Sequence, residues 1–304
     1  MTRKKKKIII IVAVVVVALI VAAFAPFLLN WPYRDEAPAA GAESPDFDLS
    51  SMFLTYGFNQ GYLSVKGQGL FSGDRVKVSD TYFGLPVTYI GEGAFKDNAK
   101  LKGITFPGAL GGIATEAFSG CTSLNNIVIP ESLKAIDRNA FKDCTSLTSL
   151  VIPGNVQIGT GAFMGCTSLT SFTILDGETE ISSNAFKGCT SLSEVSIPSN
   201  IKSIDANAFA GCTNLVFSKY DNALYLGNAE NPYVALIKVV DDEISSCNVH
   251  PDTKIFADES FADCFLLESI NFAGTMAEWN KISFPLSWDF GAGPYTVYCT
   301  DGEI

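Results

Sequence analysis

The chain has 304 residues, of which 47% are hydrophobic and 17% are charged, and its formal net charge is −11. This length and apolar content allow a sizeable buried core in one or two domains. The negative charge argues against nucleic acid as a partner, because its phosphates attract Lys and Arg, and against docking of the globular part on an anionic lipid surface.

The N-terminus predicts a membrane anchor. Residues 1–7 are a short basic tail, and residues 8–29 are almost wholly apolar and carry no charge. A helix of this length spans roughly 30 Å, which is the thickness of a bilayer core. Because basic residues stay on the cytoplasmic side, we expect a single-pass protein of the cell membrane with a cytoplasmic N-terminus and an extracellular C-terminal domain.

A cleaved signal peptide is the alternative for the same segment. Ala23-Phe24-Ala25 has the small-x-small pattern of a cleavage site, although Pro26 would follow it. Cleaved signals have a shorter apolar region of about 7–15 residues, which favours the anchor. Residues 30–50 are rich in Pro, Ala and acidic side chains, a composition typical of a flexible linker.

Residues 51–90 contain short alternating runs separated by Gly, such as Tyr62-Leu63-Ser64-Val65, and predict a β-rich N-terminal cap. Residues 91–272 carry a repeat. An aromatic residue that follows Ala returns every 22 or 23 residues, at Phe95, Phe118, Phe141, Phe163, Phe186 and Phe209. A fixed period in this range with a Leu/Ile rhythm predicts a solenoid of leucine-rich repeats.

One repeat shows how its residues are expected to be arranged. In Ser149-Leu150-Val151-Ile152-Pro153, alternation along a strand places the Leu and Ile inward and the Ser and Val outward. Pro153 ends the strand because it has no N–H to donate. The Ala-Phe pair is predicted on a short helical or 3₁₀ turn, with Phe141 as the large core side chain. No single coil buries its own apolar face, so neighbouring coils must cover one another.

The phrase I-P-x-x-L-x-x-I-x-x-x-A-F-x-x-C-T-S-L resembles the BspA-like (Treponema-type) leucine-rich repeat over roughly residues 76–272. The resemblance implies a β-rich solenoid with parallel strands and short helical or 3₁₀ turns, which here follows an N-terminal transmembrane helix. It also implies a bacterial or protist cell-surface protein associated with adhesion and with binding to host or matrix proteins.

The repeat is interrupted once. Two apolar runs around a Gly/Asn/Pro turn predict a β-hairpin inserted near residues 216–246. Residues 273–304, with Trp279, Trp288, Tyr295 and Tyr298, predict a C-terminal cap that covers the open end of the solenoid. The phrase G-T-M-A-E-W-N-K-I-S at residues 274–283 resembles the terminal segment of the same family of surface proteins.

The cysteine pattern favours packing over chemistry. Six of the eight cysteines share one repeat position: Cys121, Cys144, Cys166, Cys189, Cys212 and Cys264. Because free Cys is often buried, we expect a column of buried thiols. Cys247 and Cys299 lie outside this position and are candidates for a disulfide. His250 is the only histidine. No motif indicates a catalytic residue, a metal site or a cofactor, so we do not expect an enzyme.

The outward positions of the predicted strands are the candidate binding face. They are small, polar or β-branched: Asn126, Val128, Ser149, Val151, Ser171, Thr173, Glu194 and Ser196. The main hypothesis is a surface module that binds an extracellular protein or glycan through this face and through the insertion near residues 216–246. A passive structural spacer without a ligand is the alternative. A surface hydrolase is kept as a third hypothesis, because a glycosidase needs only two carboxylates.

Overall fold

The computed structural model describes residues 54–59, 62–69, 72–205 and 207–304. The predicted basic tail, the anchor at residues 8–29 and the linker at residues 30–50 lie outside these ranges. Within the described residues, no helix combines the length and the apolar character needed to cross a bilayer.

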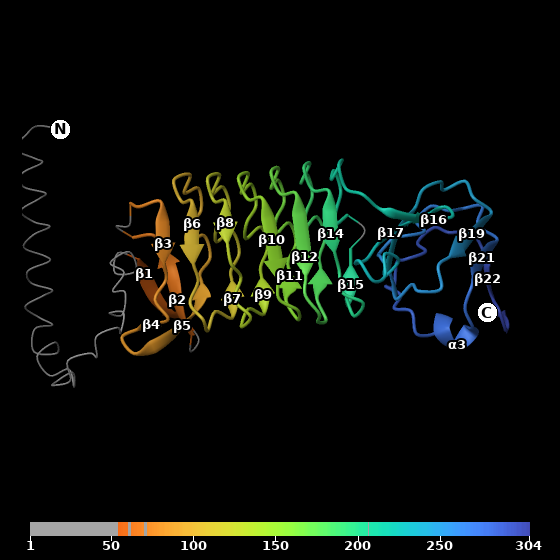
Figure 1. Ribbon diagram of the computed structural model, residues 1–304, viewed down its shortest axis with the longest axis horizontal. Coiled ribbons are helices and arrows are strands. Elements are labelled where there is room, and N and C mark those ends of the chain that lie inside the picture. Colours follow the sequence, from red (N-terminus) through yellow and green to blue (C-terminus); the bar gives the residue numbers. More distant parts are fainter. Residues whose placement is uncertain (1–53, 60–61, 70–71, 206) are drawn as a thin grey trace, which may run out of the picture. The chain divides into compact units, whose positions relative to one another are not determined.

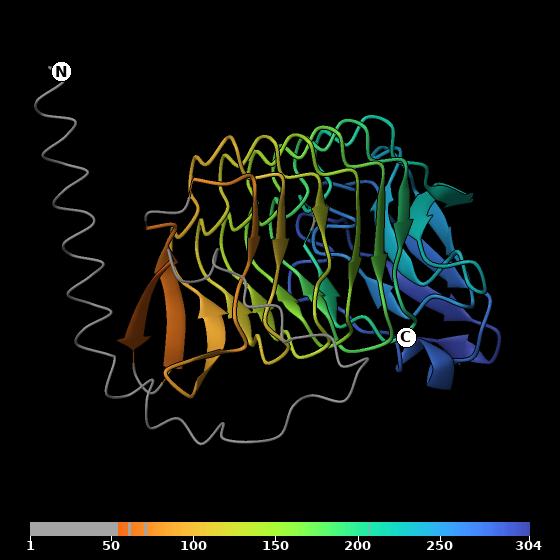
Figure 2. The ribbon, with the colours of Figure 1, turned by 60° about the vertical axis from the view of Figure 1, so that its left-hand side comes forward.

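The repeats wind into coils that pair side by side through two rows of parallel strands (Figures 1 and 2). The first row continues through β5 (Leu85–Ile90), β7 (Gly112–Ile113), β9 (Ala135–Ile136), β11 (Gln157–Ile158), β13 (Glu180–Ile181) and β15 (Ser203–Ile204). The second row consists of two separate sheets: β3 (Arg75–Lys77), β6 (Gly103–Thr105) and β8 (Asn126–Ile127), then β10 (Ser149–Ile152), β12 (Ser171–Ile174) and β14 (Glu194–Ser196).

The Ala-Phe segments are tight turns, and the predicted helical or 3₁₀ turn is wrong. The residue before the Ala has a positive φ, as at Glu116 (55°) and Asn139 (55°), and so does a residue four positions later, as at Gly120 (75°) and Asp143 (57°). Two left-handed residues in five interrupt any helix. The conformation explains why Gly, Asn and Asp recur at these positions, because they tolerate it best.

These turns also bond from coil to coil. The N–H of Phe118 donates to the carbonyl of Ala140 at 2.7 Å, and the N–H of Phe141 donates to the carbonyl of Ala162 at 2.7 Å. The same bond recurs from Phe95 to Ala117 and from Phe163 to Ala185. The turns therefore form a third ladder of backbone hydrogen bonds, in addition to the two rows of strands.

The core is built around a column of phenylalanine rings. Phe95, Phe118, Phe141, Phe163, Phe186 and Phe209 lie one above the next, with ring centroids 5.0 to 5.4 Å apart and ring planes within 10° of parallel. The inward Leu and Ile side chains pack around this column and are buried with it. Each ring is covered on both faces only because a coil lies on either side.

Five of the repeated cysteines, Cys121, Cys144, Cys166, Cys189 and Cys212, line the same core. Each of these five thiols donates to the carbonyl of the Phe one coil earlier, for example Cys144 Sγ to Phe118 O at 3.2 Å and Cys166 Sγ to Phe141 O at 3.2 Å. All eight cysteines are free. Burial raises the pKa of Cys121 to about 12, so the reactive thiolate is disfavoured. The predicted column of buried thiols is present for these five, whereas Cys264 is buried in the second core cluster and donates to the carbonyl of Ala262 at 3.9 Å.

The N-terminal part of the described chain adds antiparallel strands to the first row. β1 (Thr55–Asn59) pairs with β2 (Tyr62–Gly67), and β2 pairs in parallel with β5. β4 (Thr81–Tyr82) returns against β5 through a two-residue turn at Phe83 and Gly84, both with positive φ. Such turns match the twist of a hairpin.

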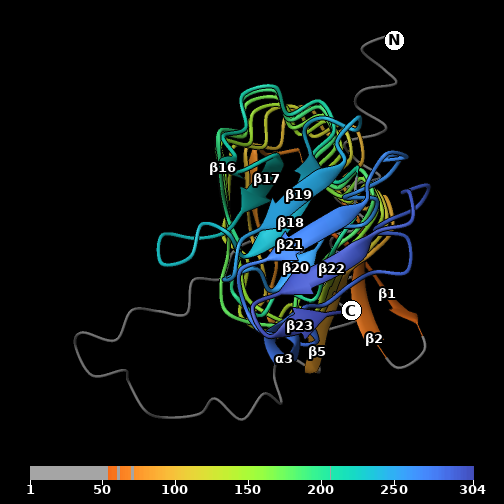
Figure 3. The same ribbon diagram turned by 90° about the vertical axis from the view of Figure 1, so that its right-hand side faces the viewer.

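After the repeats, an antiparallel group occupies the stretch in which a hairpin is predicted. β16 (Ser218–Tyr220) pairs with β17 (Ala223–Leu226), which pairs with β18 (Ala235–Val239). Parallel pairing then resumes between β18 and β20 (Ile255–Phe256), and along β19 (Ser246–Val249), β21 (Ser269–Phe272) and β22 (Thr296–Cys299), as seen in Figure 3.

A second aromatic cluster lies in the C-terminal part of the described residues. The helix α3 (Met276–Trp279) begins with a capping box between Thr275 and Glu278. Its Trp279 packs edge-on against Phe256 and Phe272, and Trp288 packs edge-on against Phe256 and Phe261. β23 (Gly302–Glu303) pairs antiparallel with β22 at the end of the sheet.

Replacement of Phe141 by Ala tests the phenylalanine column. The ring is fully buried, so its loss leaves a cavity and should lower the free energy of unfolding by about 3–5 kcal/mol. Leu286→Ala is the control, because this side chain is fully exposed and should change stability by less than about 0.5 kcal/mol. Urea unfolding of both variants measures the difference. Equal effects would contradict the role of the column.

Candidate functional site

The predicted binding residues of three neighbouring coils lie in two rows on one sheet. Ser149 pairs with Ser171, which pairs with Glu194. Val151 pairs with Thr173, which pairs with Ser196. Ser149, Val151 and Glu194 are exposed, and Ser171, Thr173 and Ser196 are half-buried. We call the outward side of β10, β12 and β14, together with Val128, the strand face.

The two remaining predicted residues belong to the coil before β10. Asn126 lies in β8, where its backbone pairs with Gly103 of β6. Val128 follows β8 directly and is 78% exposed. Because β8 and β10 belong to different sheets, Asn126 is not part of the sheet that joins the other strand-face residues.

A hollow of about 320 Å³ lies on the strand face between the coils of β8 and β10. Val128, Val151 and Leu175 line it, and they are 78%, 53% and 42% exposed. Sequence reasoning missed Leu175. The signal was available, because Leu175 follows the inward Ile174 at the place where Pro130 and Pro153 follow the inward Ile of their own coils.

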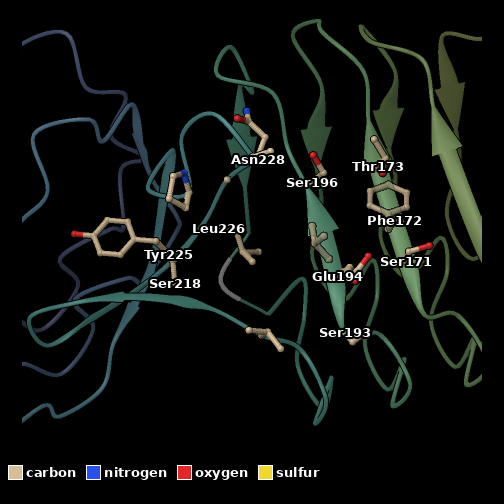
Figure 4. A pocket seen from close by; sticks show the side chains of 15 residues that line it. Ser171, Phe172, Thr173, Ser193, Glu194, Ser196, Ser218, Tyr225, Leu226 and Asn228 are labelled. Atoms are coloured by element: carbon tan, nitrogen blue, oxygen red, sulfur yellow. The ribbon is translucent and has the colours of Figure 1, made fainter.

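A second hollow, of about 450 Å³, lies where the sheet ends beyond β14 (Figure 4). We call it the end groove. One side is formed by strand-face residues, including Ser171, Glu194 and Ser196, and the other by the antiparallel group, including Leu226 and Asn228. The second side belongs to the predicted insertion near residues 216–246, and its place beside β14 depends on the bridge between Ser196 and Gly227.

The charges of the strand face are few. Glu194 is the one carboxylate on β10, β12 and β14, and Glu131 lines the hollow between the coils of β8 and β10. No ion pair of either carboxylate is present among the described residues. The ion pair between Lys202 and Glu180 lies on the other row of strands, because Glu180 is in β13 and Lys202 directly precedes β15. In the part of the chain that the structure describes, no group of three or more His, Cys, Asp or Glu side chains is arranged to hold a metal ion.

His250 belongs to an aromatic cluster away from these rows. Its ring stacks on Tyr233 with centroids 3.9 Å apart and meets Tyr220 edge-on at 4.8 Å. Its Nδ1 accepts a hydrogen bond from the backbone N–H of Asp252 at 3.1 Å. Burial lowers the pKa of His250, and the nearby Asp252 carboxylate opposes this effect. The neutral ring therefore supports the turn that begins at Pro251.

The possible disulfide between Cys247 and Cys299 is not formed. Cys247 is buried in β19, where its register partner in β21 is Ile270, and Ile270 in turn pairs with Val297 of β22. Cys299 lies two residues beyond Val297, on the strand that is second from β19. Since strands lie about 4.8 Å apart, this separation exceeds the reach of a disulfide.

The state of His250 makes a prediction for stability against pH. Because the folded pKa lies below the unfolded value, the unfolded chain binds the proton first as pH falls. The contribution of His250 to stability is thus fully present above about pH 6.5 and decreases as pH falls toward the folded pKa. In His250→Asn, the side-chain oxygen replaces the hydrogen-bond acceptor and does not titrate. The free energy of unfolding of this variant should therefore decrease less between pH 7 and pH 5 than that of the unaltered chain. Urea unfolding at each pH measures it, and identical slopes would refute it.

Comparison with known proteins now identifies the repeats. The sequence pattern of the BspA type leucine rich repeat region matches residues 82–216 in six copies. A search of curated proteins finds no match. The crystal structure of the T. pallidum leucine-rich repeat protein TpLRR is similar, with 27% identity and a TM-score of 0.53, over 74% of this chain and 90% of that chain.

A leucine-rich repeat protein from Bacteroides ovatus is 25% identical, with a TM-score of 0.47, over 79% of this chain and 70% of that chain. The predicted resemblance is confirmed by the family pattern together with the likeness to TpLRR. Residues 82–216 therefore carry leucine-rich repeats of the BspA type.

Proposed function

We propose that this chain is a cell-surface protein that binds an extracellular protein through its strand face. The observation that carries the proposal is the hollow lined by Val128, Val151 and Leu175, three exposed apolar side chains from neighbouring coils. Single exposed apolar residues are ordinary, whereas a group of them in a polar surround is typical of an interaction site.

The surrounding side chains suit such a contact. Ser149, Ser171, Thr173 and Ser196 are short, and the parallel pairing of their strands places them in even rows. Short side chains lose little conformational entropy when a partner covers them, so less of the interaction energy is lost in ordering. Their hydroxyl groups both donate and accept hydrogen bonds. A partner that buries the three apolar side chains gains roughly 25 cal/mol for each Å² removed from water.

The membrane anchor is the second part of the proposal. The apolar residues 8–29 and the basic residues 3–7 support a single span with the repeats outside the cell. The linker at residues 30–50 would then hold the repeats away from the lipid surface. This arrangement leaves the strand face accessible to extracellular partners.

Binding is tested with the purified full chain against arrays of extracellular matrix proteins and glycans. For any protein that binds, the double variant Val128→Lys/Val151→Lys should weaken affinity at least about tenfold, because it places two charges in an apolar contact. Gln157→Lys is the matched control, since Gln157 is exposed on β11 in the other row of strands.

Unchanged affinity in the double variant would place the contact elsewhere and refute the role of the strand face. A chain that retains no protein or glycan would favour the passive spacer. A chain that retains glycans and no protein would leave the strand face as a surface for sugars, which contradicts the proposed class of partner.

Membrane attachment is tested by alkaline extraction of membranes from cells that produce the full chain. We expect the chain in the membrane pellet and a variant without residues 8–29 in the supernatant, because a spanning apolar helix resists extraction. The N-terminal sequence of the extracted protein gives the control. A new N-terminus at Pro26 would show cleavage after Ala25 and overturn the anchor.

A further inference from the structure

The end groove exists because the regular coil is interrupted after Val216. In the preceding coils, the strand of the second row is followed 22 or 23 residues later by a parallel strand, as β10 is by β12 and β12 by β14. The corresponding residues after β14 form β16, which pairs antiparallel with β17 instead. β14 is therefore the last strand of its sheet, and the space beside it is the end groove.

Both ends of this space are closed by the chain itself. At one end, the N–H of Val216 donates to the carbonyl of Ser193 at 3.2 Å. At the other, the N–H of Ile197 donates to the carbonyl of Gly227 at 3.0 Å, and Asn228 Nδ2 donates to the carbonyl of Ile197 at 2.9 Å. A partner strand cannot extend the sheet through these closures, so the groove suits a single inserted side chain.

The lining defines the chemistry of that side chain. Glu194 is the one charged residue among the described residues of the lining, and it lies beside Ser171, its register partner (Figure 4). Hydroxyl groups of Ser196 and Ser218 add hydrogen-bond acceptors. Val216, which is 73% exposed, and the half-buried Val195 supply apolar surface.

An arginine side chain matches all three features. Its stem covers apolar surface while its charged head stays polar. The guanidinium group carries five donors in a fixed plane, which suits one carboxylate surrounded by hydroxyl oxygens better than the compact ammonium of lysine. An anionic group is disfavoured, because no cation is among the described residues that line the groove. The net charge of −11 likewise favours a basic partner segment.

We propose that the end groove receives an arginine side chain of the protein that binds the strand face, with the guanidinium group opposite Glu194. This inference rests on the proposed function and names the residue type that the partner presents there. Asn228 is a positioning residue, because its amide closes the groove and its Oδ1 accepts from the N–H groups of Glu230 and Asn231.

The test uses methyl NMR of the full chain, labelled at Val and Leu methyl groups, during titration with Nα-acetyl-arginine amide. We expect shifts confined to Val195, Val216 and Leu226, which line the groove. The neutral isostere Nα-acetyl-citrulline amide should bind at least about tenfold more weakly, because it lacks the charge that pairs with the carboxylate. Glu194→Gln should reduce arginine binding to the citrulline level.

Glu178→Gln is the matched control, because it removes the same charge from an exposed residue outside the groove, and it should leave the titration unchanged. An unshifted methyl signal of the buried Leu147 shows that Glu194→Gln is folded. Equal binding of arginine and citrulline amides, or unchanged binding in Glu194→Gln, would overturn the inference. Shifts of the same methyl groups by chitobiose and not by arginine would also overturn it.

Failure here is distinguishable from failure of the proposed function. Suppose that Val128→Lys/Val151→Lys no longer binds the partner protein while arginine amide causes no shifts in the groove. The proposed role of the strand face is then supported, and the arginine site is refuted. If arginine amide binds the groove and no macromolecule binds the chain, the proposed function falls.

Discussion

Every coil of this protein depends on its neighbours to keep its interior dry. The phenylalanine rings from Phe95 to Phe209 repeat at 5.0 to 5.4 Å, close to the spacing of hydrogen-bonded strands. One translation therefore satisfies both the backbone ladders and the aromatic contacts. A ring that lost one neighbour would expose a face to water, so burial and hydrogen bonding favour the same register along the stack.

The same translation explains why the cysteines are conserved within the repeat. From Cys121 to Cys212, each thiol donates to the carbonyl of the Phe in the preceding coil, as Cys144 does to Phe118. Regular stacking also produces the even rows of Ser149, Ser171 and Glu194. The surface proposed to bind a partner is thus a direct product of the core.

Departures from the repeat create the hollows. Leu175 replaces a proline that ends two of the neighbouring strands and adds an apolar side chain to the strand face. The antiparallel group β16–β18 removes the strand that would cover β14 and leaves the end groove. A solenoid without these departures would present a uniform surface, whereas specific recognition needs particular residues at particular places.

The sequence by itself determined the coil, the inward Phe, Leu and Ile, the buried thiols and the outward rows, because these follow from a local period and from the alternation of a strand. It did not determine the turns, in which Glu116 and Asn139 adopt left-handed conformations. Only the tertiary structure decided that Val128, Val151 and Leu175 share one hollow, and that Asn228 closes a groove beside Glu194. These contacts join residues on different coils. Their geometry depends on the strand at which parallel pairing of the sheet ends.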